Sequence, residues 1–195
     1  MLIKGNKIGI RTFRKEDVVP FYAAAAESIE HMHEFMPWCH PNYSIEESEA
    51  WVTSRGEAWE SADEYSFIIY SMENDELLGG VAINQINPAH KIGNIGYWVR
   101  KNALNKSMAT EAISLVAAFG FETLGLNRLE IVTLPNNGAS RKVAENAGAK
   151  YEGIMQGRLL VHGKALDACM YSLVEQLTKG AEVFEKESPR SLVEK

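Results

Sequence analysis

The sequence predicts an α/β fold, in which a mixed and mostly antiparallel sheet has helices on both faces. Two observations predict it. Three strand-like segments follow one another between residues 65 and 99, and later strand-like and helical segments alternate along the chain. The 195 residues are 46% apolar and 24% charged, which fits one compact domain and excludes a disordered chain.

The N-terminal part is expected to form one strand and two helices. Residues 6–14 alternate as in a strand, and an alanine-rich helix follows as far as Ala26. Residues 29–43 lack a clean period and contain two prolines, so we expect a loop or short helical turn with exposed aromatic side chains. Ser44 and Glu47 form a capping-box pair, which begins the next helix.

The remaining elements are expected from hydrophobic period and turn residues. They are, in order, strands at 65–71, 77–86 and 92–99, a helix from Ser107 to Gly125, a strand at 128–133, a helix from Asn137 to Asn146, and strands at 150–161 and 165–174. The domain is expected to cover residues 1–177, and residues 178–195 are expected to form a charged C-terminal tail.

The charge of the chain argues against one class of partner. There are 20 basic and 26 acidic side chains, which gives a formal net charge of −6. Nucleic acids are bound by clustered lysine and arginine, so no nucleic-acid partner is expected. A cationic or amine-bearing partner is compatible with the excess of acid, which also favours solubility.

The sequence points to the cytoplasm. Its longest largely apolar stretch, Val18 to Ala26, is far shorter than the roughly 20 residues that cross a bilayer, so no membrane partner is expected. The N-terminus has no apolar core followed by a cleavage site. The two cysteines, Cys39 and Cys169, favour free thiols in a reducing compartment.

A candidate anion site lies where a helix begins at Ser107. The first turn of a helix exposes unpaired backbone N–H groups at the positive end of the helix dipole, and Lys106 adds a full charge there. Local spacing alone does not distinguish this site from an ordinary strand-to-helix connection, because every helix has such an N-terminus.

Several separated motifs give this junction a context. They are IRTFRKEDV at 10–18, FMPW at 35–38, LLGGVAI at 77–83, IGYWV at 95–99, MATEA at 108–112 and NNGASRKVAENAGAKYEG at 136–153. In this order and spacing they resemble the GNAT acetyltransferases, and within them the ribosomal-protein N-terminal (RimJ/RimL-type) branch, over roughly residues 7–175. The resemblance implies a GNAT-like acyl-CoA N-acyltransferase fold that uses acetyl-CoA and no metal.

The resemblance also implies where acetyl-CoA binds. In the family, backbone amides of a loop with the pattern Q/R-x-x-G-x-G/A hold the pyrophosphate, and the preceding strand aligns the pantetheine. The residues implied here are Tyr97, Trp98, Val99, Asn105, Lys106, Ser107, Met108, Ala109, Thr110 and Asn137. Leu104 takes the first place of the pattern, Ser107 replaces its central glycine and Asn105 replaces another common glycine. Since asparagine tolerates positive φ and serine is small, the loop is expected to keep its shape.

Asn137 and Ser140 precede a short helix, and taken alone they are ordinary capping residues. The resemblance implies that Asn137 hydrogen-bonds the pantetheine arm. It also implies that Ser140 is catalytic, as a proton donor near the sulfur. Many relatives place a tyrosine four residues after this serine; Ala144 occupies that position, so Ser140 remains the candidate.

The acceptor is inferred from acid–base chemistry. About a tenth of an α-amine with a pKa near 8 is neutral at pH 7, whereas well under a thousandth of a lysine amine is. Many relatives carry a glutamate on the central strand where this chain has Asn94. Lack of an obvious base favours an α-amine, or a base that acts through water from Glu34, Glu64 or His40.

Residues 31–40 contain three histidines, a glutamate and a cysteine. Their spacing fits no standard zinc pattern, so no metal site is predicted. The resemblance places this segment along the acceptor groove, where Glu34, Phe35, Trp38 and His40 would bind the substrate. Packing of Trp38 against the first helix is the alternative.

Together these observations predict an enzyme that moves an acetyl group from acetyl-CoA to an amine by direct attack. The expected acceptor is a protein N-terminus of the ribosomal-protein type, and the chain is expected to be a monomer or a homodimer. Two alternatives stay open: a small amine acceptor (polyamine, aminoglycoside or amino acid), and a CoA-binding module that has lost catalysis through its altered loop.

Overall fold

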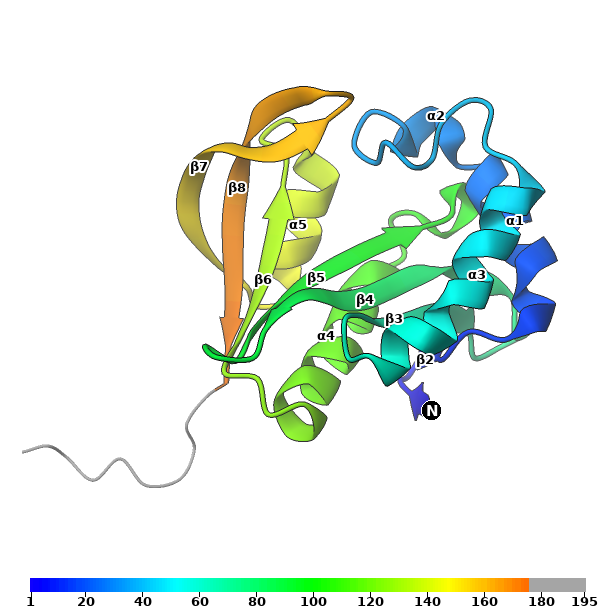
Figure 1. Ribbon diagram of the computed structural model, residues 1–195, viewed down its shortest axis with the longest axis horizontal. Helices are drawn as coiled ribbons and strands as arrows, with labels where there is room; N and C mark the ends of the chain where they lie inside the picture. The colour runs from blue at the N-terminus through cyan, green and yellow to red at the C-terminus, as the bar shows by residue number, and fades with distance from the viewer. Residues whose placement is uncertain (176–195) are drawn as a thin grey trace, which may run out of the picture.

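One eight-stranded mixed sheet organises the protein in a computed structural model, which describes residues 1–175 (Figure 1). The strand order is β1-β2-β3-β4-β5-β6-β8-β7, in which β5 and β6 pair in parallel and the other neighbours are antiparallel. The predicted mixed and mostly antiparallel sheet is therefore confirmed. The tail expected at 178–195 lies outside the described residues.

The strands are β1 (Leu2–Lys4), β2 (Ile8–Arg11), β3 (Tyr65–Ser71), β4 (Leu77–Asn87), β5 (Ile92–Val99), β6 (Arg128–Thr133), β7 (Lys150–Val161) and β8 (Lys164–Val174). The helices are α1 (Val18–Ala26), α2 (Ile29–Met32), α3 (Ile45–Glu60), α4 (Met108–Ala118) and α5 (Gly138–Asn146); a π-helical turn at Phe119–Thr123 extends α4. Short 3-10 turns occur at Lys15–Asp17 and Lys101–Ala103. Among the described residues no helix is long and apolar enough to cross a membrane.

The strand predicted at residues 6–14 is wrong at both ends. It is confined to β2, and a turn at residues 5–7 separates it from the short edge strand β1. Glu111 on α4 holds this turn, because its carboxylate accepts hydrogen bonds from the main-chain N–H groups of Asn6 and Lys7. This partner lies about a hundred residues away, so local alternation could not indicate the turn.

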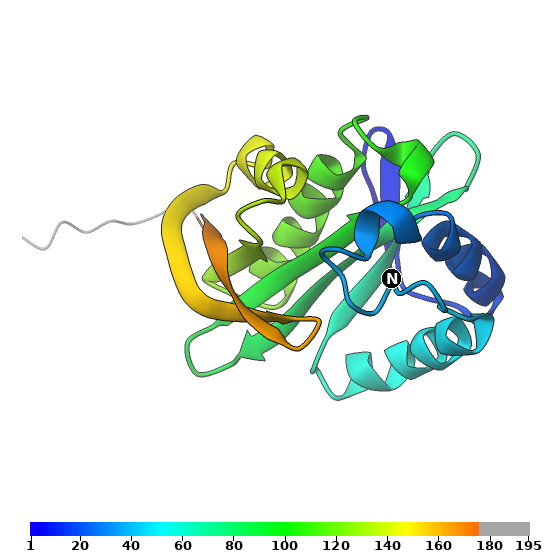
Figure 2. The ribbon, with the colours of Figure 1, turned by 90° about the horizontal axis from the view of Figure 1, so that it is seen from above.

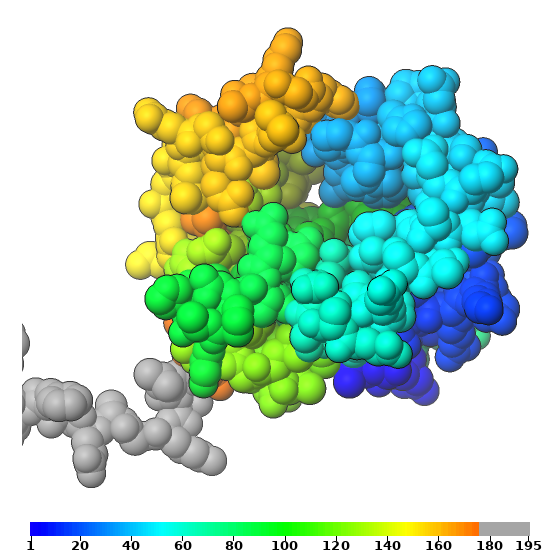
Figure 3. Space-filling view, viewed as in Figure 1, coloured from blue at the N-terminus to red at the C-terminus, as the bar shows by residue number. Residues whose placement is uncertain are grey.

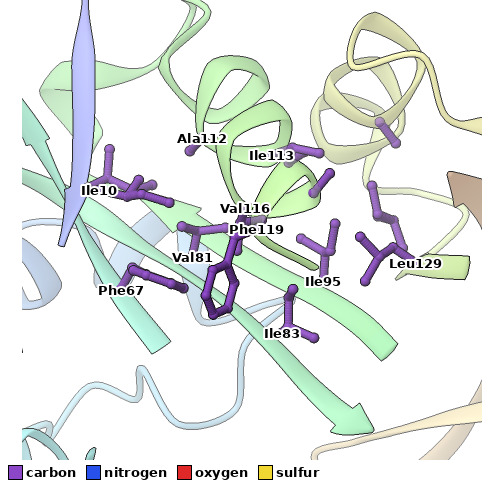
Figure 4. Packing of buried hydrophobic residues seen from close by; sticks show 14 of the residues in the cluster. Ile10, Phe67, Val81, Ile83, Ile95, Ala112, Ile113, Val116, Phe119 and Leu129 are labelled. Atoms are coloured by element: carbon purple, nitrogen blue, oxygen red, sulfur yellow. The ribbon is translucent and has the colours of Figure 1, made fainter. Parts of the chain in front are cut away.

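Both faces of the central strands are buried. Phe67 and Ile69 of β3 belong to the cluster beneath α4, whereas Ile68 and Tyr70 pack against α1 and α3. This explains the nearly continuous apolar run of β3, because a strand alternates apolar and polar residues only when one of its faces meets water. Figure 4 shows side chains of α4, including Val116, packed on the cluster from the sheet.

The parting of β5 and β6 determines where a ligand can lie. The two strands pair from Ile92 with Arg128 to Asn94 with Glu130, and no further. Beyond Asn94, β5 continues alongside β4, while β6 continues alongside β8. Figure 1 shows the strands diverging. Within residues 1–175, the edge of β5 that faces β6 therefore has no strand partner beyond Asn94.

Candidate active site

A cavity of about 120 Å³ lies in the gap between the diverging strands β5 and β6. Its walls bring together Tyr97 from β5, Asn137 and Ser140 from the start of α5, and Phe35 from the segment after α2. The side-chain oxygen of Asn94 is buried nearby without a hydrogen-bond partner. The gap therefore gathers residues that the sequence singled out from three distant segments.

The start of α5 is fixed by two sets of hydrogen bonds. The side-chain oxygen of Asn137 accepts from the N–H of Ser140 at 3.0 Å, so the predicted cap is present. The Tyr97 hydroxyl lies 2.8 Å from Ser140 Oγ and donates to the Ser140 carbonyl at 3.0 Å. Burial raises the pKa of Tyr97 to about 12, so this phenol keeps its proton at neutral pH. Sequence reasoning missed this pair, since nothing in the spacing joins residues 97 and 140.

The loop before α4 has the backbone conformation of a glycine-rich loop without its glycines. Asn105 and Ser107 have φ of +60° and +63°, which confirms that the substituted loop keeps a left-handed shape. Within the described residues no oxygen accepts a hydrogen bond from the N–H groups of 105–110. Lys106 is exposed beside them.

These features fit acetyl-CoA. Unpaired amides at a helix N-terminus bind phosphate oxygens, and Lys106 adds positive charge in an acidic chain. The unpartnered edge of β5 could pair with the amides of pantetheine through the main-chain groups of Tyr97 and Val99, whereas those of Trp98 face β4. The cavity at Ser140 lies where the edge of β5 meets α5.

A second, larger cavity of about 450 Å³ lies on the face of the sheet covered by α1 and α3. We call it the aromatic cavity, because eight phenylalanine, tyrosine and tryptophan residues line it: Phe13, Phe21, Trp38, Tyr43, Trp51, Phe67, Tyr97 and Trp98. Met36, Gly96 and Tyr97 line both cavities, so the two are neighbours across β5. The sequence did not indicate this cavity.

The residues expected to bind the acceptor have different positions. Trp38 and His40 line the aromatic cavity, and Phe35 lines the gap between the strands. Glu34 accepts a hydrogen bond from Asn136 at 2.8 Å, which joins the segment after α2 to the loop before α5. The ring of Trp38 also stacks on Phe21 of α1 at 6.4 Å, so the packing alternative holds as well.

A contact between two histidines joins the β7–β8 hairpin to the segment after α2. The His162 ring at the tip of the β7–β8 hairpin lies 4.5 Å from the His33 ring and hydrogen-bonds the His33 carbonyl at 2.9 Å. Figure 2 shows this tip beside the segment after α2, and Figure 3 shows an opening beneath the contact.

Two of the three histidines of residues 31–40 make hydrogen bonds, whereas both ring nitrogens of His31 are buried without a partner among the described residues. His33 Nδ1 lies 3.2 Å from the Cys39 carbonyl oxygen, and His40 Nε2 lies 2.9 Å from Glu47. Burial raises the pKa of the Cys39 thiol to about 11, which disfavours the thiolate that metals bind. Within residues 1–175, no cluster of three metal-binding side chains occurs.

Comparison with known proteins gives these features a family. Residues 7–150 match the model of the acetyltransferase (GNAT) domain. The chain belongs to the GNAT acetyltransferases. The "Probable N-acetyltransferase YjcK" of Bacillus subtilis (strain 168) is 30% identical over 164 residues, which are 83% of this chain and 91% of that protein. The ribosomal-protein-serine acetyltransferase of Escherichia coli (strain K12) is 22% identical over 169 residues, 87% of this chain and 93% of that one.

Solved structures confirm the GNAT fold. RimL, a ribosomal L7/L12 α-N-protein acetyltransferase solved with coenzyme A, superposes with a TM-score of 0.80 at 19% identity, covering 89% of this chain and 98% of that one. The family, the fold and acetyl-CoA as the acetyl donor are thus as the sequence predicted. This GNAT chain is an acetyl-CoA-dependent N-acetyltransferase.

Proposed function

We propose that this GNAT enzyme acetylates the α-amine at the N-terminus of a protein or peptide. One observation carries the proposal: both carboxylates considered as a base are already engaged, Glu34 by Asn136 and Glu64 by Arg55 at 3.0 Å. His40 binds Glu47 through Nε2, so among these three side chains only His40 Nδ1 is open to act as a base. An α-amine needs little help from a base, because about a tenth of it is neutral at pH 7.

The relatives support the same acceptor class. One curated relative acetylates a ribosomal-protein serine by its name, and a solved neighbour acetylates the α-amine of a ribosomal protein. We further propose that residues 1–177 form the catalytic domain. Two buried free thiols, Cys39 and Cys169, support a location in the cytoplasm.

The proposed roles of the residues follow from their positions. Bound acetyl-CoA supplies an acetyl thioester, whose transfer leaves a thiolate that needs a proton. Ser140 holds a proton at Oγ in the wall of the gap, and Tyr97 holds Ser140 in place. Asn137 caps α5 and so orients Ser140, while the amides of 105–110 and Lys106 bind phosphate oxygens.

The acceptor class is tested with two matched peptides. One has a free N-terminus and no lysine; the other has a blocked N-terminus and one lysine. Because the neutral fractions of the two amines differ more than about 100-fold at pH 7, we expect kcat/KM to differ by about that factor. Thiol release gives the rate, and mass spectrometry locates the acetyl group. Comparable rates would overturn the proposal, and polyamine and aminoglycoside arms test the small-amine alternative.

A further inference from the structure

We infer that the aromatic cavity binds a large apolar side chain next to the acceptor amine, so that peptides beginning with residues such as leucine or phenylalanine are preferred. This inference rests on the proposed function and names the acceptor within it. It is carried by the walls of the cavity, its connection to the gap at Ser140, and the distribution of charge around it.

The walls of the cavity are aromatic rings that support one another. The Trp98 ring lies 5.4 Å from Phe21 and 5.7 Å from Trp38, and the Trp38 ring lies 5.6 Å from Tyr43, all as edge-to-face pairs. Such pairs favour a defined arrangement of rings, so the cavity is preformed. Gly80 on β4 makes room for the indole of Trp98, because a Cβ there would lie 2.9 Å from its Nε1.

The cavity connects with the place where the acetyl group is expected. Gly96 and Tyr97 line both the aromatic cavity and the gap that holds Ser140. An amine at Gly96 would therefore face the gap on one side, while the group attached to its α-carbon would point into the aromatic cavity. Of the two cavities, only the aromatic one has the size of ordinary ligand pockets, which are about 300–1,000 Å³.

The size and polarity of this cavity select the side chain. A serine or alanine side chain would leave most of about 450 Å³ to water against aromatic surface, which is unfavourable. The acidic groups in the wall are engaged, Glu64 with Arg55 and Glu47 with His40. A charged acceptor side chain would thus lose water without gaining a free partner, whereas a large apolar one would release water from the rings.

The test uses a series of lysine-free peptides that differ only in their first residue: serine, alanine, leucine or phenylalanine. Thiol release at saturating acetyl-CoA gives kcat/KM for each. We expect leucine and phenylalanine to exceed serine and alanine by about 10-fold or more, since burial of several methylene groups in an apolar site commonly gives such factors. Phenethylamine, a free amine with the same apolar group, is assayed in parallel.

Two variants change the cavity in opposite ways. Trp38→Ala removes one wall, and Ala82→Leu fills the cavity from β4; each should lower the ratio of phenylalanine to serine peptide about 5-fold or more. Met72→Ala is the matched control, because Met72 is exposed in the β3–β4 turn, lines neither cavity, and should leave the ratio unchanged. Titration with acetyl-CoA checks that each variant is folded.

The outcomes separate this inference from the function on which it rests. If serine and alanine peptides react as well as leucine and phenylalanine peptides, the inference is overturned and α-amine acetylation stands. If phenethylamine reacts and no peptide does, the apolar cavity is supported and the peptide acceptor is overturned. If both cavity variants keep the wild-type ratio, the cavity does not select the side chain and the inference fails.

Discussion

The hydroxyl of Tyr97 on β5 lies 2.8 Å from the Oγ of Ser140 on α5, across the gap where β5 and β6 part. The same hydroxyl also bonds the Ser140 carbonyl at 3.0 Å. One phenol thus ties the first turn of α5 to the central strand. Four residues after Ser140, Ala144 is fully buried against the core, so no hydroxyl lies there and Tyr97 provides the nearby phenol instead.

Removing the phenol should slow catalysis more than it weakens binding of the donor. In Tyr97→Phe, Ser140 loses the partner that orients its Oγ, and we expect kcat to fall about 10-fold with little change in KM for acetyl-CoA. Loss of the hydrogen bond should lower the free energy of unfolding by about 1 kcal/mol. Steady-state kinetics and urea unfolding measure the two effects.

Ser140→Ala separates the two functions of this pair. The substitution removes Oγ and leaves the carbonyl that Tyr97 also binds. The loss of stability should therefore be smaller than in Tyr97→Phe, while kcat should fall at least as far as in that variant. A Ser140→Ala enzyme with wild-type kcat would exclude Ser140 as the proton donor.

The pH dependence should be set by the acceptor and not by the phenol. Burial raises the pKa of Tyr97 to about 12, so Tyr97 stays protonated throughout the neutral and moderately alkaline range. With an N-terminal peptide, kcat/KM should rise as the amine loses its proton near pH 8 and then stay level to about pH 10. A fall between pH 8 and 10 would show that a group with a lower pKa must be protonated.

A glycine at position 107 in the loop before α4 should raise both the stability of the protein and its affinity for acetyl-CoA. Ser107 has φ of +63°, a conformation that costs a residue with a Cβ about 1 kcal/mol relative to glycine. In Ser107→Gly we expect up to about that much added stability, and tighter acetyl-CoA binding by a few-fold as the amides gain closer access to phosphate. Ser107→Ala is the control: it keeps the Cβ and should show neither gain. Calorimetric titration and thermal unfolding measure both.

Features that depend only on neighbouring residues, such as helix caps and left-handed loop residues, could be predicted from the sequence. The capping box of Ser44 and Glu47 is present, with the Ser44 N–H 2.9 Å from the Glu47 carboxylate, and the left-handed Asn105 follows from its residue type. Contacts between distant segments were not predictable in this way. The Tyr97–Ser140 pair depends on how two elements meet, because no single segment encodes that distance.

The aromatic cavity illustrates the same limit. Trp38 and Trp98 lie 60 positions apart, and α3 contributes Trp51, whose side chain lines the cavity although it is 39% exposed. The hydrophobic period indicates which face of a helix or strand is apolar, but it does not indicate whether the aromatic rings on that face fill the core or surround a cavity. Only the packing of α1, α3 and β5 decides this.

Acid should destabilise the fold at the junction of β6, β7 and β8. Arg128 lies 2.6 Å from Glu152, whose carboxylate also accepts from Ser172, and these partners lower the pKa of Glu152 from 4.5 to about 2. A carboxyl with a lowered pKa adds stability above about pH 4.5, and this contribution is lost as the pH falls toward 2.

Glu152→Gln should therefore be less stable than wild type at pH 7, and the difference should shrink as the pH falls through this window. Glu49→Gln, on the exposed face of α3, should show no such convergence. Urea unfolding at a series of pH values measures the effect, and a constant difference from pH 7 to 2.5 would contradict it.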